Sequence, residues 1–329
     1  MLISEARERA GRELLGFAWR QWGQVGVSTN VAGGDRWAVD PEALVLFTIG
    51  LGKWDPRLFD EMLDWLALNH GLLSMQRLRN LSRRFPVATG LVAAVIAWTR
   101  EPVPAQLLKG QPAPAKKQPV FSPDVLGFVA VADPTFEEYG YLRPRVTRSG
   151  KSREPDATAP AGLAFQLRHL FGPGSRSEVM RVLLTWEQGP LDAARIADEA
   201  GFAKRNASDA LAALAASGVI MAAWSGNERL FTADRAQWAA LLGRAALPAF
   251  VPWSRLLPAA LEVIGWLDAE SGAADSDYLI ASHARTVMDR ITHDLQAAGV
   301  ATPRGSLTAD PSYLPAVLAS VDSLLAKLG

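Results

Sequence analysis

The sequence predicts a mainly helical protein built from more than one unit, with a single short β-hairpin. Its 329 residues exceed what one small core usually holds. Apolar residues recur at steps of three and four along most of the chain, which is the period of an amphipathic helix. Asp-Pro pairs at 40–41 and 55–56 place a capping side chain directly before a proline at the first helical position. Only residues 219–233 alternate in the manner of two short strands.

Four segments follow from a pass along the chain. Residues 1–100 are expected to form a helical N-terminal domain, with helices at 2–23, 40–52, 55–69, 75–85 and 87–100. Prolines, glycines and basic residues dominate 101–162, which predicts a partly ordered basic linker. Residues 163–245 contain helices followed by the hairpin, and 246–329 are again helical.

Composition excludes several classes of protein. The chain is 49% hydrophobic and 21% charged, which is typical of a folded globular protein. It has no cysteine, so disulfides, thiolate metal sites and cysteine nucleophiles are excluded, and a reducing cytoplasm suits it. The longest apolar run, Leu91 to Trp98, is well short of the roughly 20 residues that span a bilayer. The first residues carry both charges and lack a signal-peptide core, so we expect a cytoplasmic protein without a membrane partner.

The order of elements between residues 171 and 242 is the most informative pattern in the chain. Three helices are predicted at Ser175 to Trp186, Leu191 to Ala200 and Lys204 to Ser217, and Gly201 permits the left-handed turn between the second and third. The third helix has an inward stripe of Ala207, Ala210, Leu211 and Leu214. Gly218 ends it, and the hairpin follows around the turn "SGNE".

This stretch resembles the winged-helix regulators of the ArsR and MarR type. The resemblance implies a winged helix-turn-helix domain, here flanked by helical domains, whose third helix lies in the major groove of DNA. The resemblance then assigns base reading to Lys204, Arg205, Asn206 and Ser208. It assigns the contact of the wing with the phosphates or the minor groove to Arg229, with Asn227 beside it. The absence of cysteine and of paired histidines departs from the metal-sensing members and argues against a metal effector.

A second basic helix is predicted at residues 75–85. Arg77, Arg83 and Arg84 lie on its polar faces, so we expect either a degenerate second helix-turn-helix that contacts phosphates or an ordinary solvated basic face. The formal net charge of the chain is zero, but residues 71–153 hold thirteen Lys or Arg against five Asp or Glu. Binding to a polyanion would therefore use a local surface.

These patterns predict a sequence-specific double-stranded DNA-binding protein, a transcriptional regulator without catalysis. No phosphate-binding loop, dinucleotide fingerprint, nucleophile elbow or zinc-protease motif occurs, so no cofactor or metal is expected. One recognition helix reads few base pairs, so a homodimer is expected. The C-terminal helices are the candidate dimer contact, because the last of them carries an apolar stripe of Val317, Val321, Leu324, Leu325 and Leu328. The alternative is a winged-helix adaptor that binds a protein, in a regulatory or toxin–antitoxin pair. The pattern names no operator sequence and no small-molecule effector.

Overall fold

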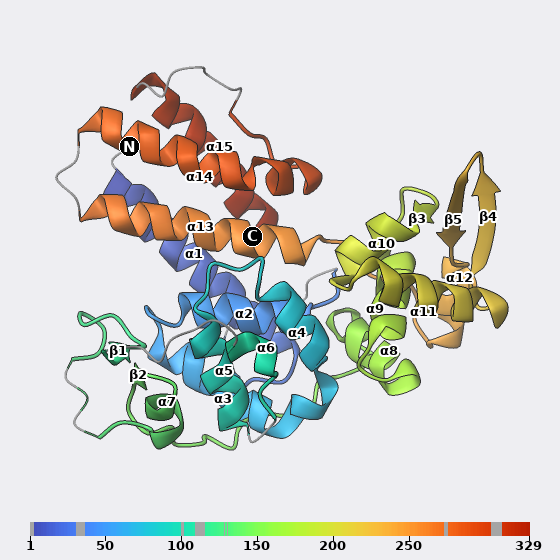
Figure 1. Cartoon of the computed structure of the whole chain (residues 1–329), viewed down its shortest axis with the longest axis horizontal. Helices are drawn as coiled ribbons and strands as arrows, with labels where there is room; N and C mark the ends of the chain where they lie inside the picture. Colours follow the sequence, from blue (N-terminus) through green and yellow to red (C-terminus); the bar gives the residue numbers. More distant parts are fainter. Residues whose placement is uncertain are drawn as a thin grey trace.

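The computed structural model of the chain describes residues 3–30, 37–99, 102–108, 116–127, 129, 131–272, 276–303 and 311–329. Over these residues the protein is mainly helical, as the sequence predicted. It has two parts, seen side by side in Figure 1. We call α1–α7 with α13–α15 the body, and α8–α12 with strands β3–β5 the head. Each part has its own cluster of buried apolar side chains.

The N-terminal helices of the body are α1 (Ile3–Gln24), α2 (Pro41–Leu51), α3 (Pro56–Asn69), the 3₁₀ turn η1 (His70–Leu72), α4 (Met75–Leu81) and α5 (Thr89–Trp98). The helix expected at 75–85 ends at Leu81, so Arg83 and Arg84 lie in the turn after it. α2 and α3 begin directly after their predicted caps. The carboxylate of Asp40 accepts a hydrogen bond from the Ala43 amide at 3.1 Å, and that of Asp55 accepts one from the Leu58 amide at 2.9 Å. Each carboxylate satisfies an amide that the first helical turn leaves without a partner.

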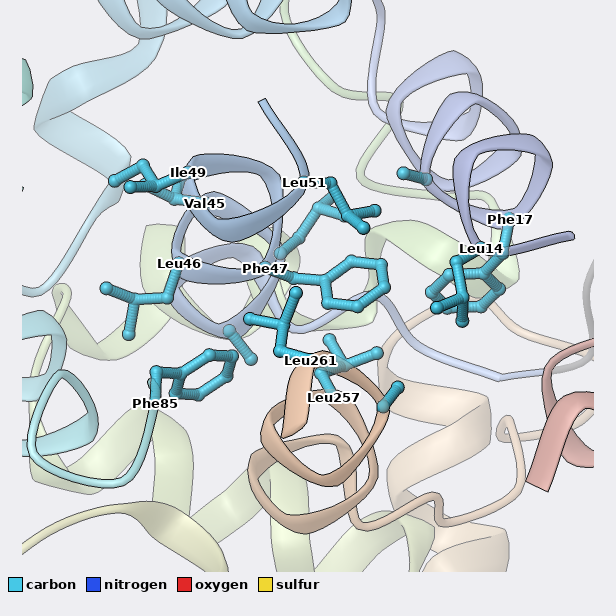
Figure 2. Close-up of a cluster of buried hydrophobic side chains, with 14 of the residues drawn as sticks. Leu14, Phe17, Val45, Leu46, Phe47, Ile49, Leu51, Phe85, Leu257 and Leu261 are labelled. Carbon is cyan, nitrogen blue, oxygen red and sulfur yellow. The ribbon is translucent and has the colours of Figure 1, made fainter. Parts of the chain in front are cut away.

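The C-terminal helices complete the same core. They are α13 (Trp253–Ser271), α14 (Asp277–Ala297), the 3₁₀ turn η3 (Pro311–Tyr313) and α15 (Leu314–Leu328). α13 packs on α1, α2 and α14. Figure 2 shows Leu257 and Leu261 of α13 beside Phe47 of α2, with Leu14 and Phe17 of α1 next to them. The segments 1–100 and 246–329, expected as separate domains, therefore share one apolar core.

The apolar stripe of α15 is already covered within the chain. Its five residues from Val317 to Leu328 are all buried, because α15 packs against α1, α13 and α14. The Arg20 guanidinium also donates a hydrogen bond to the carbonyl of Leu328 at 2.7 Å. The stripe thus offers no exposed surface to a second copy, and the reason for placing a dimer contact there is removed.

The predicted linker is built partly into the body, although its residues 109–115 lie outside the described ones. It holds the short elements α6 (Ala105–Leu108), β1 (Gln118–Pro119), α7 (Pro134–Glu138), β2 (Tyr141–Leu142) and η2 (Pro160–Gly162). β1 and β2 pair in parallel. The buried Arg143 guanidinium lies 5.0–5.3 Å from the ring centroids of Phe59, Phe121 and Phe136, a cation–π arrangement that fixes this segment on α3.

The head contains the three helices and the hairpin that the sequence predicted. Its elements are α8 (Leu163–Phe171), α9 (Ser175–Thr185), β3 (Leu191–Asp192), α10 (Ala193–Ala200), α11 (Lys204–Ala216), β4 (Met221–Ser225), β5 (Glu228–Thr232) and α12 (Arg235–Leu241). The strands form one antiparallel sheet in the order β3-β5-β4. The hairpin β4–β5 projects away from the body (Figure 1).

No helix in the described part of the chain combines the length and the apolar character that crossing a bilayer requires.

Candidate nucleic-acid interface

The first turn of α11 is held rigidly while its polar side chains face solvent. Gly201, which ends α10, has φ +72°, a left-handed conformation that few other residues adopt without strain. The inward residues of α11, including Leu211 and Leu214, are buried against α9 and α10. Lys204 and Arg205 are exposed. The apolar stripe therefore points two cations outward at the N-terminal end of the helix.

A groove of about 610 Å³ runs between α11 and the hairpin. Lys204 and Ser208 border it from α11, while Asn227 and Arg229 border it from the turn and β5. Trp224 of β4 also lines the groove. It lies opposite Arg229 in the strand register and is 72% exposed. Four of the residues predicted to contact DNA are thus brought to one groove.

The groove is not uniformly basic. Asp192, Asp209 and Glu228 line it together with the two cations, so carboxylates outnumber positive groups on its walls. A surface of this kind repels a bare phosphate backbone from its floor. It suits a ligand that presents donors as well as acceptors, such as the edges of base pairs.

The other predicted residues of α11 lie outside this groove. Asn206 borders a second hollow, of about 440 Å³, on the side of α11 that faces α9. Arg176, in the first turn of α9, lines the same hollow and is exposed. Sequence reasoning missed Arg176, because only the packing of α9 on α11 brings it near Asn206. Arg205 is exposed and lines neither hollow.

Arg77 corrects the prediction of a DNA-contacting face on α4. Its side chain is fully buried, and its guanidinium donates to both carboxylate oxygens of Asp40, at 2.5 and 2.6 Å, and to Glu42 at 2.8 Å. Its Nε donates to the carbonyl of Ala200 at the end of α10, at 2.8 Å. Arg77 therefore joins body and head and presents no charge to solvent. The prediction for Arg77 was wrong because the polar face of an amphipathic helix can pack against another part of the protein instead of facing solvent.

Arg77 belongs to a buried network of three arginines and three carboxylates. Arg168 of α8 donates to Glu42 at 2.7 and 2.8 Å and to Glu178 of α9 at 2.6 Å. Arg181 donates to Glu178 at 2.8 Å. All six groups are at most 4% exposed, and their charges balance. Because α2 and α4 supply half of the network and α8 and α9 the other half, it fixes the head on the body.

Two carboxylates of this network, Asp40 and Glu178, stay charged. Burial alone would raise the pKa of Asp40, but the charge and hydrogen bonds of Arg77 outweigh burial and lower it. Burial likewise opposes ionisation of Glu178, but the neighbouring arginines 77, 168 and 181 hold its pKa well below the usual range. The ion pairs are therefore complete at neutral pH.

Arg83 and Arg84 differ from Arg77 and from each other. Arg84 forms an ion pair with Asp198 of α10 and also donates to its carbonyl at 3.3 Å. Asp198 is shared with Arg255 of α13, whose guanidinium also lies 3.3 Å from the Glu199 carboxylate. Arg83 is exposed and has no ion-pair partner within the described residues. Arg83 is therefore left as an exposed cation for a phosphate, in the turn that follows α4.

The network itself carried a partial sequence signal. Ser175 and Glu178 have the spacing of a capping box, but α9 is capped at Gly174, whose amide donates to Ser177 Oγ at 3.3 Å. Glu178 and Arg181, three residues apart, instead pair on a buried face. Charged residues on the predicted inward side of a helix indicate such pairing.

Among the described residues, no group of three or more His, Asp or Glu side chains is placed to hold a metal ion. Comparison of the chain with protein-family models, with curated proteins and with solved structures finds no match.

Proposed function

We propose that this protein binds double-stranded DNA sequence-specifically through α11 and the β4–β5 hairpin, as a transcriptional regulator of the winged-helix type. The observation that carries the proposal is the exposed start of α11 beside a groove that the hairpin completes. Lys204 and Ser208 on one wall face Asn227 and Arg229 on the other. The N-terminal residues of a recognition helix are those that reach base edges in the major groove, and a wing contacts the neighbouring backbone.

The residue types suit base reading. Arginine and lysine pair with the O6 and N7 acceptors of guanine, asparagine with adenine, and carboxylates accept from the N4 amino group of cytosine. The carboxylates Asp209 and Glu228 in the groove favour base contact over phosphate contact. We therefore expect weak affinity for random DNA and a marked preference among sequences.

Recognition of an operator is expected to involve two copies of the chain. A single α11 covers few base pairs, and two copies on repeated half-sites would multiply the selectivity. The covered stripe of α15 argues for a contact outside the C-terminal helix.

Genomic-fragment selection with the purified full chain tests the proposal. Sequencing of the retained fragments is expected to yield one motif, and affinity for that motif is expected to exceed the affinity for random duplex. Recovery of fragments without a shared motif, with an affinity equal to that for random duplex, would contradict it.

A second candidate is the binding of a protein partner, favoured by two exposed apolar side chains on opposite faces of β4. Trp224 and Met221 of β4 are 72% and 56% exposed, and large apolar residues of these types are enriched in protein interfaces. Substitution of Met221 and Trp224 by Ser separates the two functions. Under the DNA proposal, the M221S/W224S variant still selects the duplex motif, although the affinity of the variant for that motif falls if Trp224 borders the duplex. Under the partner hypothesis, the wild-type chain selects no motif, and capture of a partner is lost in the variant.

A further inference from the structure

Strand β4 forms an open edge of the sheet in the head. The strand order is β3-β5-β4, so β4 pairs with β5 on one side only, and Figure 1 shows it on the outer side of the projecting hairpin. All five of its residues, Met221–Ser225, are exposed. Within the described chain, no segment other than β5 shares a backbone hydrogen bond with these residues. The polar groups on the free side of β4 are therefore available to another strand.

The residues of β4 lack the features that usually protect an open edge. Natural edge strands are commonly blunted by a charged side chain, a proline or a bulge. The sequence of β4, MAAWS, has no charge and no proline, and its ladder with β5 runs residue for residue without a bulge. The charged residues of the hairpin, Glu228 and Arg229, lie on β5 instead. Both the composition and the exposure of β4 thus permit pairing.

The turn of the hairpin determines which residues of β4 direct their backbone groups outward. It is a two-residue turn, and its Gly226 has φ +60°, as the tight turns of hairpins require. The pair that closes such a turn, here Ser225 with Glu228, is hydrogen-bonded, and hydrogen-bonded and non-hydrogen-bonded pairs alternate along an antiparallel ladder. The amide and carbonyl groups of Ala222 and Trp224 therefore point away from β5.

We propose that β4 pairs in antiparallel orientation with β4 of a second copy of this chain, about a two-fold axis at Ala223. This register places Ala222 of each copy opposite Trp224 of the other, so that these residues exchange the hydrogen bonds that β5 leaves free. It sets a large indole beside a small methyl group and Met221 beside Ser225, and no like charges meet. The edge is self-complementary, as a contact between identical surfaces must be.

The choice of a second copy, and not of a foreign strand, rests on the proposed function, in which two heads read a repeated site. Phe231 of β5 is buried in the core of the head and lies opposite Ala222, so the face of the sheet that they share is the one that packs toward α11. A two-fold axis perpendicular to the sheet keeps this face on one side in both copies. The two copies of α11 then lie on the same side of the joined sheet, as the reading of one duplex requires. Because five residues a side form a small contact, the dimer is expected to be weak without DNA.

Disulfide trapping of the full chain, with oxidised glutathione as the oxidant, tests the pairing without DNA, because the chain has no cysteine of its own. In Ala223→Cys the two thiols meet at the axis, where the Cα atoms of a non-hydrogen-bonded pair lie about 4.5 Å apart, within reach of a disulfide. In Ser225→Cys, on the same face of the same strand, the two equivalent Cα atoms lie roughly 13 Å or more apart, which is too far. We expect the Ala223→Cys dimer to accumulate at least about tenfold faster than the Ser225→Cys dimer. Equal rates, or no dimer of either variant, overturn the proposal.

Charge substitutions at the axis give a second test, measured by sedimentation equilibrium. Ala223→Lys and Ala223→Glu each bring two like charges together, so self-association of either variant alone should weaken about fivefold. An equimolar mixture of the two places opposite charges across the axis and should restore association. Ala216→Lys, at an exposed position at the end of α11, is the control and should associate as the wild type does. A wild-type chain that stays monomeric up to about 300 µM, or a mixture that is not restored, overturns the proposal.

The pairing and the proposed function can fail separately. Rapid trapping of Ala223→Cys by a chain that selects no duplex motif supports the pairing and overturns DNA binding. Selection of a motif by a chain that neither cross-links nor self-associates supports DNA binding and overturns the pairing.

Discussion

Helices α4 and α11 carry similar polar residues on similar amphipathic patterns, yet the structure uses them in opposite ways. The cations at the start of α11 are exposed beside a groove. The first cation of α4, Arg77, is buried in a charge-balanced network, and Arg84, in the turn after α4, pairs with Asp198 of the head. α4 therefore fixes the head on the body, whereas the exposed start of α11 is the surface that we propose reads DNA. A basic helix face shows only that something polar lies against it, which can be water, a ligand or another part of the chain.

The largest expected effect comes from Arg77. Arg77→Met leaves Asp40, Glu42 and Glu178 buried with fewer partners, so the free energy of unfolding should fall by about 3–5 kcal/mol, as it does when one member of a buried pair is removed. Urea denaturation measures it. Arg83→Met, in the exposed turn that follows the same helix, is the matched control and should change stability by less than about 0.5 kcal/mol. Equal effects in the two variants would remove the contrast between the buried and the exposed arginine.

Acid should weaken the same network. The pKa values of Asp40 and Glu178 are lowered in the folded state, so their stabilisation is complete above the ordinary carboxyl pKa and is lost as pH falls below it. Below about pH 4, the free energy of unfolding should fall with a slope that approaches about 1.4 kcal/mol per pH unit for each such group. Urea denaturation between pH 7 and pH 3 measures the slope, which should be shallower in Glu178→Gln. The same slope in the variant would assign the acid sensitivity to other carboxylates.

On α11, Arg205→Ala should lower affinity for the selected duplex by about 1–3 kcal/mol and relax discrimination at one base pair. Competition titrations over a panel of single-base variants of the duplex measure both quantities. Ala213→Ser, at an exposed position farther along α11 that lines neither hollow, serves as the control and should leave both quantities unchanged. If discrimination stays intact at every position, Arg205 is not a base-reading residue.

The smallest effect concerns Arg83. As an exposed cation in the turn after α4, it is placed to contact a phosphate at most, so Arg83→Ala should weaken selected and random duplexes alike and reduce the slope of log affinity against log salt by about 1. Titrations over a salt series measure this slope. A loss of sequence discrimination in this variant would instead make this turn a second base-reading element.

The sequence was most informative where local rules decide the structure. The caps at Asp40 and Asp55, the left-handed Gly201 and the inward stripe of α11 are short-range features, and each was predicted in place. The partners of distant segments were not predictable in this way. No local sequence pattern indicates that α13 and α15 complete the core of α1 and α2, or that Arg77 pairs with residues of α2 and α9. The same limit hid Arg176 and the carboxylates of the groove, which become neighbours only through packing.

The central claim is that α11, and not α4, reads DNA. Fluorescence anisotropy with the selected duplex tests it most directly. It compares the double substitution Lys204→Ala/Arg205→Ala on α11 with Arg83→Ala in the turn after α4, once circular dichroism has shown that both variants fold. We predict a loss of at least about tenfold in affinity and a reduced preference for the motif in the α11 variant, against a loss of less than about threefold and an unchanged preference in the Arg83 variant. Wild-type affinity and preference in a folded α11 variant would contradict the account.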